Sequence, residues 1–143
     1  MGAATVLMAS GEALPKQVKG IVADCGYTSA WEEFAHQMRH GFHLPVFPIL
    51  HLTSCISQLL AKYGFKEASA VEAVKRATVP IVFIHGTRDT YVPTEMVHPL
   101  YDACPTEKEL VLVEGAAHAL SYMTDPGRYE ETLTRFLTKL HMG

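Results

Sequence analysis

The stretch Pro80-Ile-Val-Phe-Ile-His-Gly-Thr-Arg-Asp-Thr-Tyr-Val-Pro93 decides the fold class. Its run Ile81 to Ile84 is apolar and rich in β-branched residues, which is typical of a buried strand. Gly86 ends the run, and a polar turn presents Asp89. Such a turn lies at the carboxyl edge of a parallel sheet, where open α/β folds collect ligand-binding and catalytic groups. Taken alone, Asp89 is explained equally well as a turn residue.

Two further apolar runs have the character of buried strands and alternate with segments of helical periodicity. The helical segments are residues 2–10, 30–41, 67–77, 94–104 and 126–140. Alternation of strands and helices favours a parallel sheet. The sequence therefore predicts an α/β fold with about three parallel strands, at residues 18–23, 80–85 and 109–114, and with flanking helices.

Three segments carry more specific expectations about packing. Residues 2–10 are apolar on almost every side, which predicts a buried helix. The helix 30–41 places Trp31, Phe34, Ala35, Met38 and Phe42 on one face, and this face is expected to pack inward. Residues 42–65 are rich in histidine, proline and large apolar groups, and we expect an irregular cap segment with one or two helical turns near 53–63.

Composition narrows the function classes. A chain of 143 residues is expected to form one domain, residues 1–143. Its net charge of −3, without a basic block, gives no support for nucleic-acid binding. The three cysteines are widely spaced and indicate neither a disulfide framework nor a zinc site, so no cofactor is predicted. Reduced thiols and the lack of an apolar run near 20 residues predict a cytoplasmic protein, unless a preceding signal or anchor segment has been lost.

A second polar group follows the third predicted strand. His118 comes after Gly115-Ala-Ala, at the same sheet edge where Asp89 is expected. A carboxylate beside an imidazole fixes its tautomer and stabilises its protonated form, as a general base requires. A lone histidine in such a turn is more readily explained as a surface residue. The matched pair instead favours catalytic roles for Asp89 and His118.

The chain resembles the α/β-hydrolase superfamily. Ile-His-Gly-Thr-Arg-Asp-Thr-Tyr-Val-Pro at 84–93, followed by Gly-Ala-Ala-His at 115–118, is similar to the end of such an enzyme. Asp-Cys-Gly-Tyr-Thr-Ser at 24–29 and the segment after it resemble the Bem46-like and prolyl-oligopeptidase-like bacterial esterases. The resemblance spans the whole chain. It implies hydrolysis of a carboxylic ester or related acyl bond, with Asp89 as the triad acid and His118 as the base.

The sequence departs from the family pattern at the nucleophile. These enzymes carry a serine in Gly-x-Ser-x-Gly, a motif that often reads Gly-x-Ser-Met-Gly-Ala-Ala. This chain begins with Met1-Gly-Ala-Ala. The resemblance thus aligns Met1 with the residue whose N–H forms half of the oxyanion hole, and it leaves the serine out. We therefore expect the C-terminal half of a hydrolase domain, inactive by itself.

Cys25 and Asp24 are further candidates for the same chemistry. Cys25 follows the first predicted strand, but a buried neutral thiol explains it better than a nucleophile, because no neighbouring cation in sequence would lower its pKa. Asp24 is an alternative acid but a weaker candidate than Asp89, because turn or capping duty explains it.

Two non-catalytic readings remain open. His36, His40 and His43 share a helix face and, with His51, form a weak candidate metal site, although a solvated stripe explains them better. The strand 18–23 would also have a free edge in such a half domain, and free edges invite pairing. An interaction module is therefore the alternative, with a homo-oligomer or a missing N-terminal half as partner.

Overall fold

The fold is built on a sheet of three parallel strands, as predicted. The structure is a computed structural model that describes residues 1–142, and the side chains of residues 1–140. The strands β1 (Ile21–Asp24), β2 (Ile81–Gly86) and β3 (Lys108–Val113) are hydrogen-bonded in the order β1-β2-β3. All six residues of β2 are buried, because neighbouring strands cover both of its edges and helices cover both faces.

The strand boundaries differ from the predicted ones by one to three residues. The largest difference is in β1, which begins at Ile21 rather than at residue 18. Gly20, just before it, lies against Phe136 and Leu140, and a Cβ there would come within 2.7 Å of the Phe136 ring. Residues 18–20 lie outside the strand, and the Val18 N–H instead donates within a turn, to the Pro15 carbonyl at 2.9 Å.

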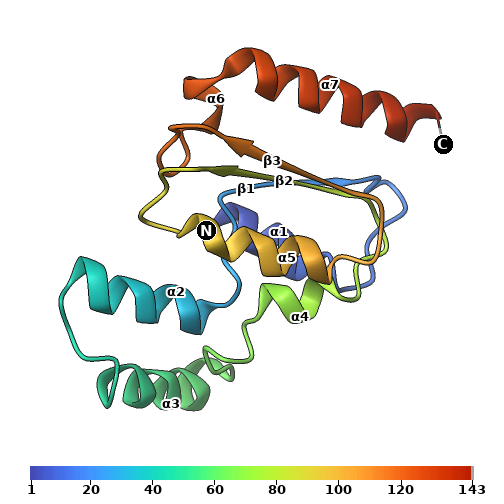
Figure 1. Cartoon of the computed structure of the whole chain (residues 1–143). Coiled ribbons are helices and arrows are strands. Elements are labelled where there is room, and N and C mark those ends of the chain that lie inside the picture. The colour runs from blue at the N-terminus through green and yellow to red at the C-terminus, as the bar shows by residue number, and fades with distance from the viewer. Residues whose placement is uncertain (143) are drawn as a thin grey trace.

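Helices cover the sheet in two layers (Figure 1). On one face lie α1 (Gly2–Ala9), α4 (Ala70–Val74) and α5 (Val97–Ala103), the last preceded by the 3₁₀ turn η2 (Thr94–Met96). On the other face lies α7 (Pro126–Met142), which follows the short α6 (Ser121–Thr124). Alternate residues of the strands fill the two cores: Phe83 packs toward α1, α4 and α5, and Ile84 packs toward α7.

The helix α1 is less buried than its composition predicts. Ala4 and Leu7 are buried in the core, but Val6 is exposed and so is Met1 at the start of the helix. One apolar side of α1 therefore faces away from the described part of the chain.

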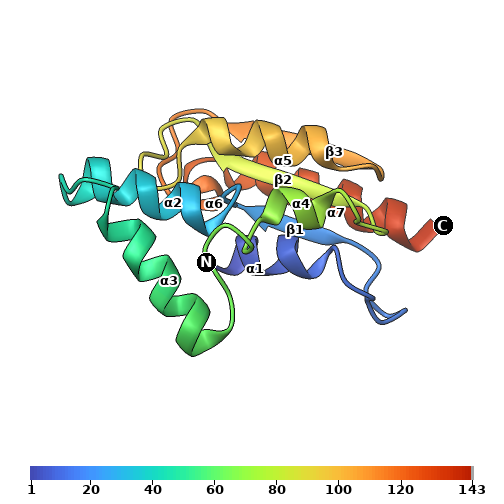
Figure 2. The same ribbon diagram turned by 90° about the horizontal axis from the view of Figure 1, so that it is seen from below.

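The remaining helices lie together off one side of these layers (Figure 2). They are α2 (Ala30–His36), its π-helical continuation η1 (Gln37–Gly41), and α3 (Ile49–Ala61). The expected irregular cap at 42–65 is thus corrected, since 13 of its residues form a regular helix. Among residues 1–142, no helix combines the length and hydrophobicity needed to cross a membrane.

The expected inward face of α2 is confirmed only in part. Ala35 is buried, and Trp31 and Met38 are partly buried. Phe34 and Phe42 are exposed, whereas Ala30 and Glu33 are buried, so the inward side is rotated from the predicted one. Ser29 caps the helix by accepting a hydrogen bond from the Glu32 N–H, as expected of a serine at this position.

Candidate active site

Asp89 occupies the loop after the central strand and is held by the backbone around it. Its Oδ1 accepts hydrogen bonds from the N–H groups of Tyr91, at 3.0 Å, and Val92, at 2.9 Å. Its side chain has no exposed surface. A carboxylate at this position is therefore fixed in orientation, with Oδ2 left to meet a second partner.

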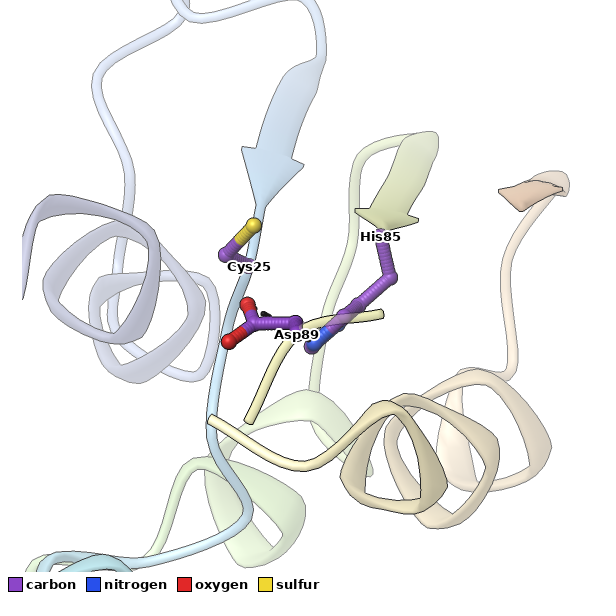
Figure 3. A group of neighbouring side chains, drawn as sticks. All are labelled: Cys25, His85 and Asp89. Atoms are coloured by element: carbon purple, nitrogen blue, oxygen red, sulfur yellow. Dashed lines mark ion pairs between the residues drawn. The ribbon is translucent and has the colours of Figure 1, made fainter. Parts of the chain in front are cut away.

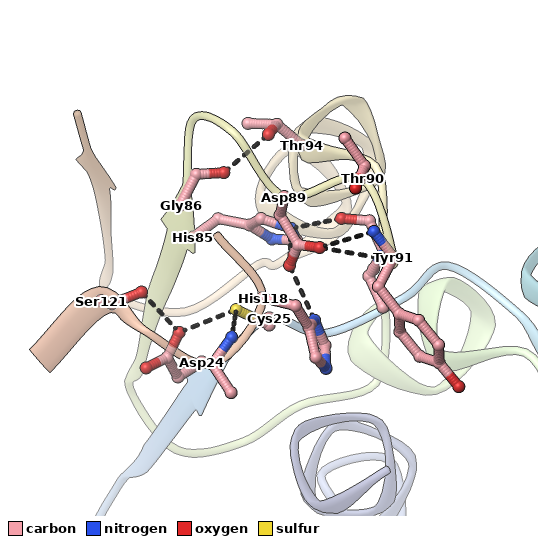
Figure 4. A network of polar contacts seen from close by, with 12 residues as sticks. Asp24, Cys25, His85, Gly86, Asp89, Thr90, Tyr91, Thr94, His118 and Ser121 are labelled. Atoms are coloured by element: carbon pink, nitrogen blue, oxygen red, sulfur yellow. Dashed lines mark hydrogen bonds and ion pairs between the residues drawn. The ribbon is translucent and has the colours of Figure 1, made fainter. Parts of the chain in front are cut away.

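That partner is His118, on the loop after β3 (Figure 4). Its Nδ1 lies 2.8 Å from Asp89 Oδ2, and its side chain is 31 % exposed. An ionised carboxylate only accepts hydrogen bonds, so this contact places a proton on Nδ1 and leaves the lone pair of Nε2 free. The arrangement can take up a proton at Nε2 and stabilise the resulting imidazolium.

Close packing of the loops after β2 and β3 allows Asp89 and His118 to come into contact. A Cβ on Gly86 would lie 2.3 Å from the carbonyl oxygen of Ala116, so only glycine allows the backbones to approach. The Arg88 N–H donates to the same carbonyl at 2.9 Å. The turn toward His118 also passes through Gly115, whose φ of +75° is favourable for glycine.

His85, which sequence reasoning did not single out, supports the Asp89 loop from the core. Its side chain is fully buried, and its Nε2 donates to the Val92 carbonyl at 2.9 Å. The same nitrogen lies 3.4 Å from Asp89 Oδ2. A polar residue inside the otherwise apolar strand Ile81–Gly86 was the available signal, because such a residue needs a buried partner.

Cys25 and Asp24 lie beside this pair but are engaged elsewhere. Cys25 Sγ accepts the Ala119 N–H at 3.3 Å and contacts Asp24 Oδ1 at 3.1 Å. The pKa of the Cys25 thiol is raised to about 12, chiefly by burial and also by the contact with Asp24, while the hydrogen bond from the Ala119 N–H acts in the opposite direction. Asp24 also accepts a hydrogen bond from Ser121 Oγ at 3.0 Å. The thiol is therefore protonated at neutral pH, and Asp24 orients Ser121 rather than a histidine.

Cys25, His85 and Asp89 also bring three ligand-type atoms within 4.8 Å of one another (Figure 3). Each of these side chains is already hydrogen-bonded within the protein. We therefore interpret this trio as a hydrogen-bonded part of the core.

The histidines of the alternative metal site are not gathered in this way. His36 Nε2 donates to the Thr90 carbonyl at 3.0 Å, and the rings of His36 and His40 are 4.7 Å apart. Within residues 1–142, His43 does not join them in a three-residue ligand cluster. The structure thus gives this reading no geometric support.

The six serines of the chain make other contacts. Three of their hydroxyls accept backbone N–H bonds, those of Ser29, Ser54 and Ser69. Three donate to oxygen atoms: Ser10 to Leu7, Ser57 to Tyr63 and Ser121 to Asp24. In the part of the chain that the structure describes, none is hydrogen-bonded to His118.

A cavity of about 220 Å³ lies beside the pair. Tyr91 forms part of its wall, and the Tyr91 ring is 4.9 Å from the His118 ring. Met1, at the start of α1, lines the same cavity. Glu33, in the first turn of α2, also lines it. The spacing of Ala30, Glu33 and Gln37 along one helix side was a signal for a different inward face.

Comparison with known proteins identifies relatives over most of the chain. The family described as "Serine hydrolase (FSH1)" matches residues 2–120. The uncharacterized protein YqkD of Bacillus subtilis is 28% identical over 141 residues, which are 99% of this chain and 46% of YqkD. Human alpha/beta hydrolase domain-containing protein 17C is 32% identical over 56 residues, 39% of this chain and 17% of that protein.

Solved structures show the same fold. The Pyrococcus furiosus esterase Pf2001 superposes with a TM-score of 0.69 at 24% identity, over 100% of this chain and 51% of the esterase. Pyrococcus horikoshii acylaminoacyl peptidase gives a TM-score of 0.67 at 17% identity, over 97% of this chain and 23% of the peptidase. The chain thus spans about half the length, or less, of these proteins.

These findings confirm the resemblance on which the sequence-based expectation rested. The family match covers well over half of the chain, and the three-stranded parallel sheet with flanking helices agrees with the solved esterase. The chain belongs to the serine hydrolase (FSH1) family and has the α/β-hydrolase fold.

Proposed function

We propose that this chain supplies the acid–base pair of a serine hydrolase that cleaves carboxylic esters or related acyl bonds. The observation that carries the proposal is the 2.8 Å contact between His118 Nδ1 and the buried Asp89 Oδ2. His118 Nε2 takes the proton of an attacking hydroxyl and returns it to the leaving group. Asp89 holds the imidazole in the required tautomer and stabilises its charged form.

The nucleophile in this proposal is a serine outside the 143 residues. The contacts of the six serines support this, because each hydroxyl serves a helix, a turn or Asp24. The high pKa of the Cys25 thiol argues against a cysteine replacement. Loss of a triad serine lowers kcat by about 10⁶-fold, so the chain by itself should be inactive. Met1 would contribute its N–H to an oxyanion hole in the assembled site.

The 143-residue chain tests the nucleophile directly. We expect no hydrolysis of short p-nitrophenyl esters above the buffer rate, and no labelling by a fluorophosphonate probe. The matched control is His118→Ala, which should be indistinguishable from the unmodified chain. Labelling that depends on His118 would contradict the proposal, and mass spectrometry of the labelled peptide would then identify the nucleophile.

The acid–base pair has a separate test that needs no nucleophile. Two-bond ¹⁵N–¹H correlation spectra should show His118 as the neutral tautomer with its proton on Nδ1. Asp89→Asn should abolish this preference, because the amide presents N–H donors in place of a purely accepting group. The exposed His98 serves as the internal control and should not respond. A proton on Nε2 of His118 in the unmodified chain would refute the assigned roles.

A second candidate function is association through the free edge of β1. Within residues 1–142, β1 is paired on one side, with β2. Val22 in this strand is exposed. We propose that this edge pairs with a second copy of the chain, because unpaired backbone groups at a sheet edge invite pairing.

A further inference from the structure

The cavity beside His118 combines aromatic walls with one buried carboxylate. Its volume is about 220 Å³, and its aromatic lining comes from the loop after β1, from α2 and the segment after it, and from the Asp89 loop: Tyr27, Phe34, Phe42 and Tyr91. Glu33 is the acidic residue in this lining. A carboxylate in such a place is costly unless it is hydrogen-bonded or paired with a charge.

The protein satisfies only part of this carboxylate. Glu33 is 6 % exposed, and its Oε1 accepts a hydrogen bond from Gln37 Nε2 at 2.9 Å. Its Oε2 is buried and has no hydrogen-bond partner among the described residues. Buried carboxylate oxygens are normally satisfied, so an unpartnered oxygen on a residue that lines the cavity calls for a partner that the described residues do not supply.

We propose that this cavity binds a primary ammonium group on an otherwise apolar arm of the substrate, with Glu33 as its counter-ion. The ammonium group brings N–H donors to the open acceptor and a positive charge to the carboxylate. The aromatic side chains around it attract a cation through their ring faces. A neutral alcohol would supply a donor without the charge, and a quaternary ammonium would supply the charge without a donor.

The position of the cavity links this binding site to the acid–base pair. Tyr91 lies in its wall and contacts the His118 ring, and the Val92 N–H in the same wall holds Asp89 Oδ1. An arm seated against Glu33 would thus place the rest of an ester or acyl substrate near His118. The assignment to substrate recognition rests on the proposed hydrolase function, whereas the binding of the ammonium group does not.

The protonation of Glu33 supports the same reading. Burial raises the pKa of this carboxyl group, while the Gln37 hydrogen bond, His36 and His118 act in the opposite direction and Asp89 adds to the increase. A bound cation would lower the pKa again. Binding of an ammonium ligand should therefore strengthen as pH rises through the range in which Glu33 ionises.

In the test, 2-phenylethylammonium is titrated into the 143-residue chain. Binding is measured by calorimetry and by the chemical shifts of residues on the cavity wall. Two matched compounds, 2-phenylethanol and trimethyl-2-phenylethylammonium, separate the donor from the charge. We expect the primary ammonium to bind about tenfold or more tighter than either, which is the difference that one added favourable interaction typically gives. Equal affinities for the three compounds would overturn the proposal, as would no binding below ~10 mM.

A pair of variants on one helix locates the counter-ion. Glu33→Gln should remove the preference for the ammonium over the alcohol, whereas Glu32→Gln, an exposed neighbour, should retain it. Retention of the preference in Glu33→Gln would overturn the assignment. If this variant does not fold, the comparison of the three ligands on the unmodified chain still decides the question. Ester assays play no part in these measurements, so failure of the hydrolase proposal and failure of this one are distinguishable.

Discussion

The ionisation of the Cys25 thiol, next to the proposed Asp89–His118 pair, is controlled by its surroundings. At pH 8, a thiol with a pKa of about 12 is ionised roughly 10³-fold less than an ordinary thiol. We therefore predict that iodoacetamide modifies the exposed Cys55 at least about 10³-fold faster than the buried Cys25. Peptide mass spectrometry over a time course measures both rates in one sample. Comparable rates would contradict the protonated, buried thiol and would reopen Cys25 as a nucleophile.

Glu33 makes the stability of the fold depend on pH. Because burial raises its folded-state pKa, the folded protein holds this proton more tightly than the unfolded chain does. The contribution to stability is then lost as pH rises from about 4.3, the ordinary glutamate value, through the folded pKa. We predict that Glu33→Gln gains stability relative to the unmodified chain as pH rises above about 4.3.

Urea denaturation at a series of pH values measures this difference. The groups that face Glu33 are Gln37 and His36 on its own helical segment and the side chains of His118 and Asp89 from the two loops. Glu32→Gln, which removes an exposed carboxylate from the same helix, is the control for effects that do not involve the buried carboxylate. A difference between Glu33→Gln and the unmodified chain that stays constant with pH would contradict the prediction.

At this scale, the sequence indicated the residues whose position depends on strand ends. Asp89 and His118 each follow an apolar run, and parallel strands bring such loops to one edge. Glu33 was not identified, because the phase of its helix depends on tertiary packing: Ala30 and Glu33 face inward, while Phe34 is exposed. His85 was not singled out for a related reason, since its partner, the Val92 carbonyl, comes from a loop whose path the sequence does not specify.

Among the elements, α3 shows a strong contrast between its two sides. Leu50 is 3 % exposed, whereas Leu60 in the same helix is 77 % exposed. We predict that Leu50→Ala lowers the free energy of unfolding by about 2–5 kcal/mol, because it leaves a cavity. Leu60→Ala should change it by no more than about 0.5 kcal/mol.

Urea denaturation of the two variants in parallel provides the measurement, and each variant controls for the other because both lose the same side-chain atoms. A large loss of stability in Leu60→Ala would show that this side of α3 is covered in solution. A small loss in Leu50→Ala would show that α3 does not dock as described.

A helix or strand could be predicted to the extent that its local sequence determines its structure. The strands were recognisable because each contains a short continuous apolar run, at residues 21–23, 81–84 and 110–113, which is typical of a buried strand. The helix α3 was not recognised in full, since histidine and threonine interrupt its apolar pattern and prolines precede it at positions 45 and 48. Its 13 residues become helical with one side against α2 and the other exposed, which weakens the periodic signal.

At the scale of the whole molecule, several apolar surfaces face away from the described chain. One is the outer side of α1 with Val6, a second is the free edge of β1 with Val22, and a third is the exposed side of α3. A small domain that leaves apolar surface of this kind in contact with water tends to associate. The charge of −3 is small enough that electrostatic repulsion would do little to oppose association.

The last prediction concerns that association. If the β1 edge pairs with a second copy, multi-angle light scattering should give a mass above the 15.8 kDa of one chain, increasing with concentration. Val22→Lys should shift the population toward the monomer, because a charged side chain at a sheet edge disfavours pairing. Val22→Thr keeps the β-branched shape without the charge and is the matched control. A monomer at all concentrations would contradict the pairing, and assembly unaffected by Val22→Lys would assign it to α1 or α3 instead.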